Sequence, residues 1–206
     1  MMKFLFDTDA LISACMNSDG VPRLALSRSI LFHETCISQS SLDELNDTFE
    51  LKIPQRLNDL KMFLDLFLPN VRIIPIPGEK IDLEKKIHDE YDQLILQAAL
   101  SAGVDVIISN DKDFLESGIK APVILNPSQS LYVDSDGEIP EFDGNIPIVE
   151  DEDAMRAMRA LRDIGEYMAK EHVAESLGLY TEEDIVKMCK EIRHEIWKER
   201  HSENSV

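Results

Sequence analysis

The chain has 206 residues, of which 44% are hydrophobic, and carries a formal net charge of −19 at pH 7. This length fits one full domain with an appendage, or two small domains, and no apolar run approaches the roughly 20 residues that a membrane-spanning helix needs. So acidic a chain does not bind phosphate backbones through bulk charge, and any action on nucleic acid requires metal ions that neutralise its acidic residues locally.

Short apolar runs alternate with helical patterns over most of the chain. In chain order, the expected elements are a strand at 3–6, helices at 9–16 and 23–30, a strand at 34–37, helices at 38–51 and 53–68, a strand at 71–76, a helix near 79–100, and strands at 104–108 and 123–125. This alternation predicts an α/β fold with a mostly parallel sheet and helices on both faces. Sites in such sheets form outside the carboxyl ends of the strands.

Turn-forming and acidic residues dominate 134–150, which we interpret as an acidic linker between a domain at 1–133 and a helical extension at 151–206. Both parts are acidic, with 12 Lys and Arg against 20 Asp and Glu in residues 1–133, and 9 against 20 in the remainder. The extension holds two amphipathic helical patterns. Their apolar stripes need the main domain, a second copy or a partner to cover them.

The three cysteines, Cys15, Cys36 and Cys189, are widely spaced and form no C-x-x-C pair. Reduced, buried thiols are therefore expected instead of a disulfide framework or a zinc site. The apolar stretch before Asp7 is also too short for a secretory signal, so a cytoplasmic location is expected.

Acidic residues follow the predicted strands. They are Asp7 and Asp9 after the first strand, Glu44 on the helix after the second, Asp92 on the helix near 79–100, and Asp111 and Asp113 after the fourth strand. Carboxylates gathered at one edge repel one another, so such a cluster favours a divalent cation, and oxygen ligands suit Mg²⁺ or Mn²⁺. Two such ions about 3.5–4 Å apart can cleave a phosphodiester without a covalent protein nucleophile.

A structural interpretation competes with this one. Acidic residues at helix starts stabilise the helix dipole by about 0.3–1 kcal/mol each. Asp9, Asp92 and Asp111 all stand where helix starts are expected, so each one taken singly fits a capping role, and only the joint pattern favours a metal site.

Four segments, FLFDTDALIS, ISQSSLDEL, DQLILQAALSAGVDVIISNDKDFL and PVILNPSQSL, resemble the PIN-domain family in that family's order and spacing. The resemblance covers about residues 2–132. It implies a three-layer α/β/α fold and Mg²⁺- or Mn²⁺-dependent cleavage of RNA, often by the toxin of a bacterial toxin–antitoxin pair.

The resemblance also assigns the site residues. It matches Asp7, Glu44, Asp92 and Asp111 to the family's catalytic, metal-binding acidic quartet, Asp113 to a further metal-binding acid and Ser109 to an auxiliary hydroxyl. Asp9, also auxiliary, stands where the family most often has Asn.

The resemblance leaves the C-terminal extension unexplained, although its second helical pattern is similar to the docking helices of some antitoxins. Self-inhibition, homodimerisation and simple extension of the core all stay open, as does an antitoxin partner. Two other functions compete with the nuclease. Asp7 and Asp9 could serve a haloacid-dehalogenase-like phosphatase, although Ala10 and Leu11 fit its motif poorly, or the chain could be a PIN-like domain that binds RNA or protein without cleaving it.

Overall fold

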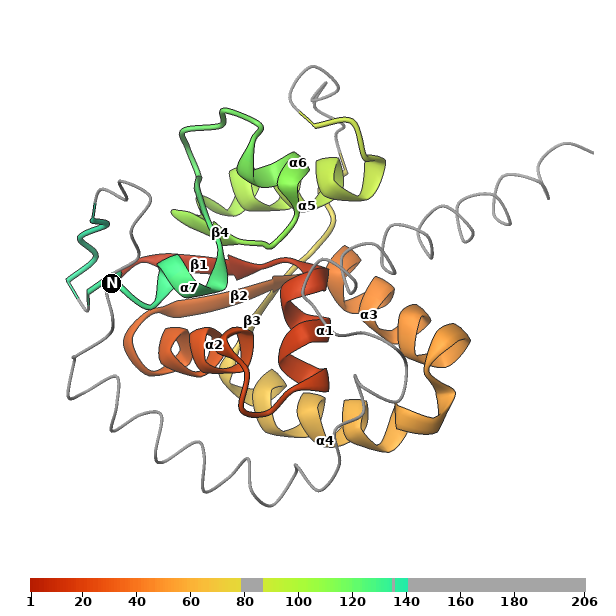
Figure 1. Ribbon diagram of the computed structural model, residues 1–206. Coiled ribbons are helices and arrows are strands. Elements are labelled where there is room, and N and C mark those ends of the chain that lie inside the picture. The colour runs from red at the N-terminus through yellow and green to blue at the C-terminus, as the bar shows by residue number, and fades with distance from the viewer. Residues whose placement is uncertain (79–86, 135, 141–206) are drawn as a thin grey trace, which may run out of the picture.

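The computed structural model describes residues 1–78, 87–134 and 136–140, and Figure 1 shows their arrangement. Five parallel strands form one sheet in the order β3-β2-β1-β4-β5. The strands are β1 (Lys3–Phe6), β2 (Glu34–Ser38), β3 (Arg72–Ile74), β4 (Val106–Ile108) and β5 (Val123–Leu125). The predicted α/β class and all five predicted strands are therefore confirmed.

Helices connect the strands. In chain order they are α1 (Thr8–Met16), α2 (Val21–Phe32), α3 (Gln39–Lys52), the 3₁₀ turn η1 (Pro54–Arg56), α4 (Leu57–Phe67), the 3₁₀ turn η2 (Leu68–Asn70), α5 (Glu90–Ala102), α6 (Lys112–Leu115) and α7 (Pro127–Ser130). None of the helices in this described part of the chain combines the length and the apolar character needed to cross a bilayer.

Two hydrophobic cores lie on opposite faces of the sheet, because successive strand residues point to opposite sides. Phe4 and Phe6 of β1 belong to the larger core with residues of α1 to α4, whereas Leu5 belongs to the smaller core with residues of α5 and α6. Figure 1 shows α5 and α6 on one side of the sheet and α1, α2 and α4 on the other. The result is the predicted three-layer α/β/α arrangement.

Several predicted boundaries differ from the observed ones, and three of these differences have a local reason. Strand β3 ends at Ile74 because Pro75, which follows it, has no amide hydrogen to donate to a neighbouring strand. The helix predicted at 53–68 begins instead with the turn η1, which opens at Pro54. Helix α5 begins at Glu90, capped by the Asp89 carboxylate, which accepts hydrogen bonds from the backbone N–H groups of Tyr91 and Asp92. Residues 79–86 of that predicted helix lie outside the described residues.

Contacts with the described domain continue just after residue 133. The Asp134 carboxylate accepts hydrogen bonds from the backbone of Gly137 and Glu138, and Ile139 packs against the larger core. The rest of the predicted linker and the whole helical extension lie outside the described residues, as does Cys189. Cys15 and Cys36 are free and buried as expected, and burial raises the pKa values of their thiols to about 12 and about 11.

Arg23 supports the core instead of facing a ligand. Its side chain is only 6% exposed, its Nε–H donates to the Ala14 carbonyl at 2.7 Å, and its guanidinium lies 4.8 and 4.9 Å from the ring centres of Phe63 and Phe67. These contacts join α1, α2 and α4, and desolvation lowers the Arg23 pKa to about 10. Arg23 therefore stays charged at neutral pH and is committed to packing.

His33 should make the fold sensitive to acid. Its ring is buried and stacks on Phe4, with 4.4 Å between ring centres. Burial, together with the positive charges of Arg28 and the N-terminus, lowers its pKa to about 4, against a small opposing effect of Asp134. The unfolded chain protonates His33 near pH 6.5, whereas the folded chain does so only near pH 4. His33 therefore leaves the free energy of unfolding unchanged above pH 6.5 and lowers it as the pH falls from 6.5 towards 4.

Chemical denaturation at several pH values tests this expectation. A His33→Phe protein, which keeps an aromatic ring against Phe4, should lose less unfolding free energy than the wild type between pH 6.5 and 4. Equal losses in the two proteins would show that His33 does not contribute to the acid sensitivity.

Candidate metal centre

The candidate site lies where two neighbouring strands of the sheet end. Strands β1 and β4 pair in parallel, and the connections after them run to opposite faces, β1 leading into α1 and β4 into α6. The Asp7 backbone N–H continues the pairing by donating to the Ile108 carbonyl at 2.9 Å. In open α/β sheets this topological switch point is where ligands bind. The strand order therefore places the expected ligand site at Asp7 and the residues that follow Ile108.

Asp7 is completely buried and serves as the N-cap of α1. Its Oδ1 accepts a hydrogen bond of 2.6 Å from the Thr8 backbone N–H, and its Oδ2 accepts one of 2.8 Å from the Ser109 hydroxyl. A carboxylate oxygen has more than one acceptor direction, so neither bond exhausts its capacity. The two bonds fix the orientation of the Asp7 carboxylate from both strands.

Ser109 connects Asp7 to Asp111. The fully buried Ser109 hydroxyl accepts the Asp111 backbone N–H at 2.9 Å while it donates to Asp7. Asp111 is 2% exposed and caps α6, its Oδ1 accepting the Asp113 backbone N–H at 2.8 Å. One hydroxyl therefore ties the acidic ends of β1 and β4 together.

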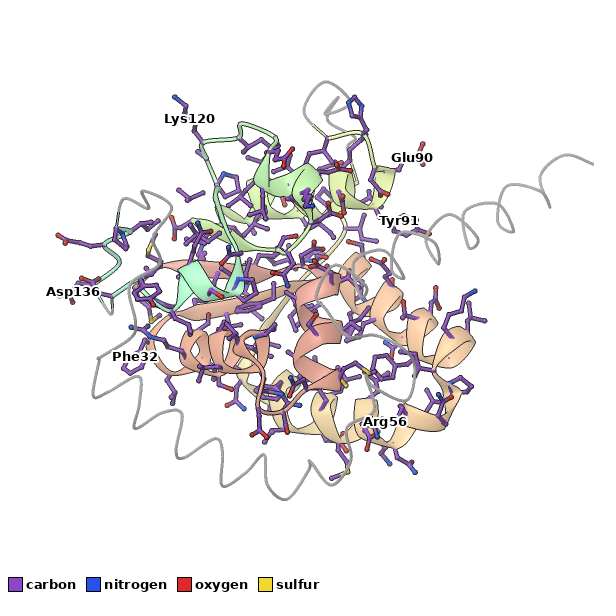
Figure 2. The ribbon with its side chains drawn as sticks, in the orientation of Figure 1. Phe32, Arg56, Glu90, Tyr91, Lys120 and Asp136 are labelled. Carbon is purple, nitrogen blue, oxygen red and sulfur yellow. The ribbon has the colours of Figure 1, made fainter. Side chains whose placement is uncertain are left out.

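Asp92 reaches this edge from α5. One ligand atom from each of Asp92, Asp111 and Asp113 lies within 4.8 Å of the other two, with Asp92 and Asp111 buried and Asp113 exposed. The neighbouring acids of α5 are placed differently: Asp89 is the helix cap, and Glu90 is exposed and points away from the body of the protein in Figure 2. The structure thus brings three of the predicted metal ligands together around one point.

Glu44 approaches from the second turn of α3, whose N-cap is Ser38. The Glu44 side chain is 3% exposed, and its Oε2 accepts a hydrogen bond of 2.6 Å from the Thr8 hydroxyl. Thr8 also donates its backbone N–H to Asp7, so Glu44 is linked to Asp7 through a single residue. The sequence interpretation missed Thr8, because no periodicity or motif indicates a contact between the first turn of one helix and the second turn of another.

Asp9 is directed at the loop after β4. Its Oδ1 accepts the Ala10 backbone N–H at 2.6 Å, and its Oδ2 accepts the Asn110 backbone N–H at 3.1 Å. Asn110 lies between Ser109 and Asp111 in the chain. The Asp9 carboxylate, which is 1% exposed, therefore holds the loop that carries Asp111.

The donor set of the Asp92, Asp111 and Asp113 cluster suits a hard divalent cation. Two carboxylate charges 4.8 Å apart repel by about 3.5 kcal/mol at an effective dielectric constant of about 20. A bound cation converts this repulsion into attraction, and carboxylate oxygens are the ligands that Mg²⁺ and Mn²⁺ prefer.

Comparison with known proteins identifies the family. A family model described as "PIN domain" matches residues 3–113, more than half of the chain. The chain belongs to the PIN domain family. No curated protein matches the chain.

Among solved structures, VapBC2 from Rickettsia felis, in a crystal structure with a DNA fragment from its promoter, is similar to the chain with a TM-score of 0.47 and 20% sequence identity. The match covers 61% of this chain and 98% of the other.

Proposed function

We propose that the protein is an endoribonuclease that depends on a divalent metal ion. One observation carries the proposal: buried carboxylates from β1, α3, α5 and the end of β4 gather at the switch point of a PIN-domain sheet, and three predicted ligands lie within 4.8 Å of one another. Family membership supports nuclease chemistry, and the resemblance of the four segments supports RNA as substrate.

The chain's own residues would hold and orient the ion. Asp92, Asp111 and Asp113 would bind it, with Asp7 and Glu44 completing the acidic set beside them. When bound, Mg²⁺ or Mn²⁺ supplies Lewis-acid polarisation of the phosphodiester and acidifies water. Ser109 would keep Asp7 and Asp111 at a fixed separation, and Asp9 would hold the Asn110 backbone so that Asp111 keeps its place.

The proposal extends to the biological setting. We propose, from the resemblance, that the protein is the toxin of a toxin–antitoxin pair with an antitoxin as partner, and that it acts in the cytoplasm. The segment at 151–206 would act as a brake whose apolar stripes dock on the nuclease domain. A chain ending at residue 140 keeps every described residue and should cleave RNA faster than the full chain. Unchanged cleavage would exclude the brake, and a change from dimer to monomer in sedimentation would assign dimerisation to the segment instead.

Two measurements test the proposed activity against its alternatives. Isothermal calorimetry should detect Mn²⁺ binding to the wild type and much weaker binding to Asp7→Asn, whereas a protein that only binds RNA should respond little to Mn²⁺ or to the substitution. Hydrolysis of a chromogenic phosphate monoester together with inactivity on RNA would instead favour the haloacid-dehalogenase-like mechanism. That mechanism gives no role to Glu44, which is joined to Asp7 through Thr8.

A further inference from the structure

Thr8 joins two acids, Asp7 at the end of β1 and Glu44 on α3. Thr8 is completely buried at the first position of α1, directly after β1. Its backbone N–H donates to Asp7 Oδ1 and its hydroxyl donates to Glu44 Oε2, both at 2.6 Å. The threonine hydroxyl is the donor in this contact, and the carboxylate oxygen accepts.

The hydroxyl contact restricts the Glu44 side chain, which is otherwise more flexible than that of an aspartate. Glu44 reaches Thr8 from α3 through a side chain with several rotatable bonds, and freezing such a side chain costs rotamer entropy. Thr8 supplies a short hydrogen bond of 2.6 Å to Glu44 from a β-branched side chain with restricted rotation. Thr8 itself is anchored in the helix that Asp7 caps. Thr8, at the start of α1, therefore orients both Glu44 and Asp7.

Buried threonines in this protein do not all donate hydrogen bonds. Thr48, one turn further along α3 than Glu44, is also completely buried, yet its hydroxyl has no hydrogen-bond partner within the described part of the chain. Burial alone thus does not account for the short contact between Thr8 and Glu44. Thr48 provides a matched control in which the same chemical change removes a hydroxyl that contacts no acid.

We propose that Thr8 is a positioning residue whose hydroxyl holds the Glu44 carboxylate in the orientation that binds a divalent ion. This inference rests on the proposed function, because it requires the acidic site to take up Mg²⁺ or Mn²⁺. Loss of a hydrogen bond that orients a ligand typically lowers metal affinity 10- to 100-fold. Thr8→Val keeps the shape of the side chain and removes only the donor.

The test is Mn²⁺ binding by isothermal calorimetry on full-length wild type, Thr8→Val, Thr8→Ser and Thr48→Val. We expect about 10- to 100-fold weaker binding by Thr8→Val, recovery to within about threefold of wild type by Thr8→Ser, and wild-type binding by Thr48→Val. Thermal unfolding of each variant verifies folding. If Thr8→Val does not fold, Thr8→Ala, which also lacks the hydroxyl and adds no bulk, takes its place.

A double substitution separates positioning from a general structural effect. If Thr8 acts through Glu44, adding Thr8→Val to Glu44→Gln should weaken Mn²⁺ binding little beyond Glu44→Gln alone. An independent, additive loss would overturn the proposal, and so would wild-type affinity in Thr8→Val while the wild type binds Mn²⁺. The second result would leave the proposed function standing, whereas absence of Mn²⁺ binding by the wild type would remove both.

Discussion

Replacement of Asp92 by Asn should reduce Mn²⁺-dependent RNA cleavage by about 10²- to 10³-fold, equivalent to about 3–4 kcal/mol of transition-state stabilisation. Asp92 lies within 4.8 Å of ligand atoms of Asp111 and Asp113, and Asn keeps its shape while removing the charge that attracts the ion. The fold should remain, because removing one of several crowded negative charges relieves repulsion. The measurement compares cleavage rates of a labelled mixed RNA pool at saturating Mn²⁺.

Asp89, at the same end of α5, provides the matched control. Its carboxylate caps the helix through the Tyr91 and Asp92 backbone N–H groups and does not belong to the Asp92, Asp111 and Asp113 cluster. Asp89→Ala should lower the free energy of unfolding by about 1 kcal/mol and leave the Mn²⁺ affinity close to that of the wild type. Equal effects of the two substitutions on Mn²⁺ affinity would show that Asp92 acts only as a helix-start acid and does not bind the ion.

Ser109→Ala should have the second largest effect. Its hydroxyl donates to Asp7 and accepts from the Asp111 backbone at a fully buried position, so its removal affects two groups at once. We expect a 10- to 100-fold loss in Mn²⁺ affinity or cleavage rate and a loss of about 1–3 kcal/mol in the free energy of unfolding.

Ser27→Ala is the control for this substitution. Ser27 is 2% exposed on α2, and its hydroxyl finds no hydrogen-bond partner among the described residues. The change should affect neither cleavage nor Mn²⁺ binding, and should cost little or no stability. Wild-type Mn²⁺ affinity and cleavage in Ser109→Ala would show that the serine bridge does not hold the acids in place.

The strands and the acids that follow them could be predicted because both depend on local patterns. Short apolar runs ended at Asp7 and before Ser109, and a parallel sheet brings such strand ends to one edge whatever the connections between them. The contact between Thr8 and Glu44 could not be predicted, since it depends on how α1 and α3 pack against each other. The packing of Arg23 against Phe63 and Phe67 is a similar case, because a lone Arg in a sequence gives no sign of burial.

The capping and metal-binding interpretations of the acids are not exclusive. Asp7 and Asp111 are both helix N-caps, and both are joined through Ser109 at the edge where Asp92 arrives. A capping carboxylate accepts backbone hydrogen bonds and retains acceptor capacity for another partner. Helix starts at a switch point therefore supply carboxylates that are already oriented by their own backbone. The same residue types in the same places can therefore serve both roles.

Metal dependence of RNA cleavage tests the central claim most directly. The wild-type protein is treated with EDTA, incubated with a labelled mixed RNA pool, and then supplied with excess Mn²⁺ while the products are followed on a gel. The carboxylate site predicts no cleavage in EDTA and cleavage once Mn²⁺ is added. Cleavage at the same rate in EDTA as in Mn²⁺ would contradict it.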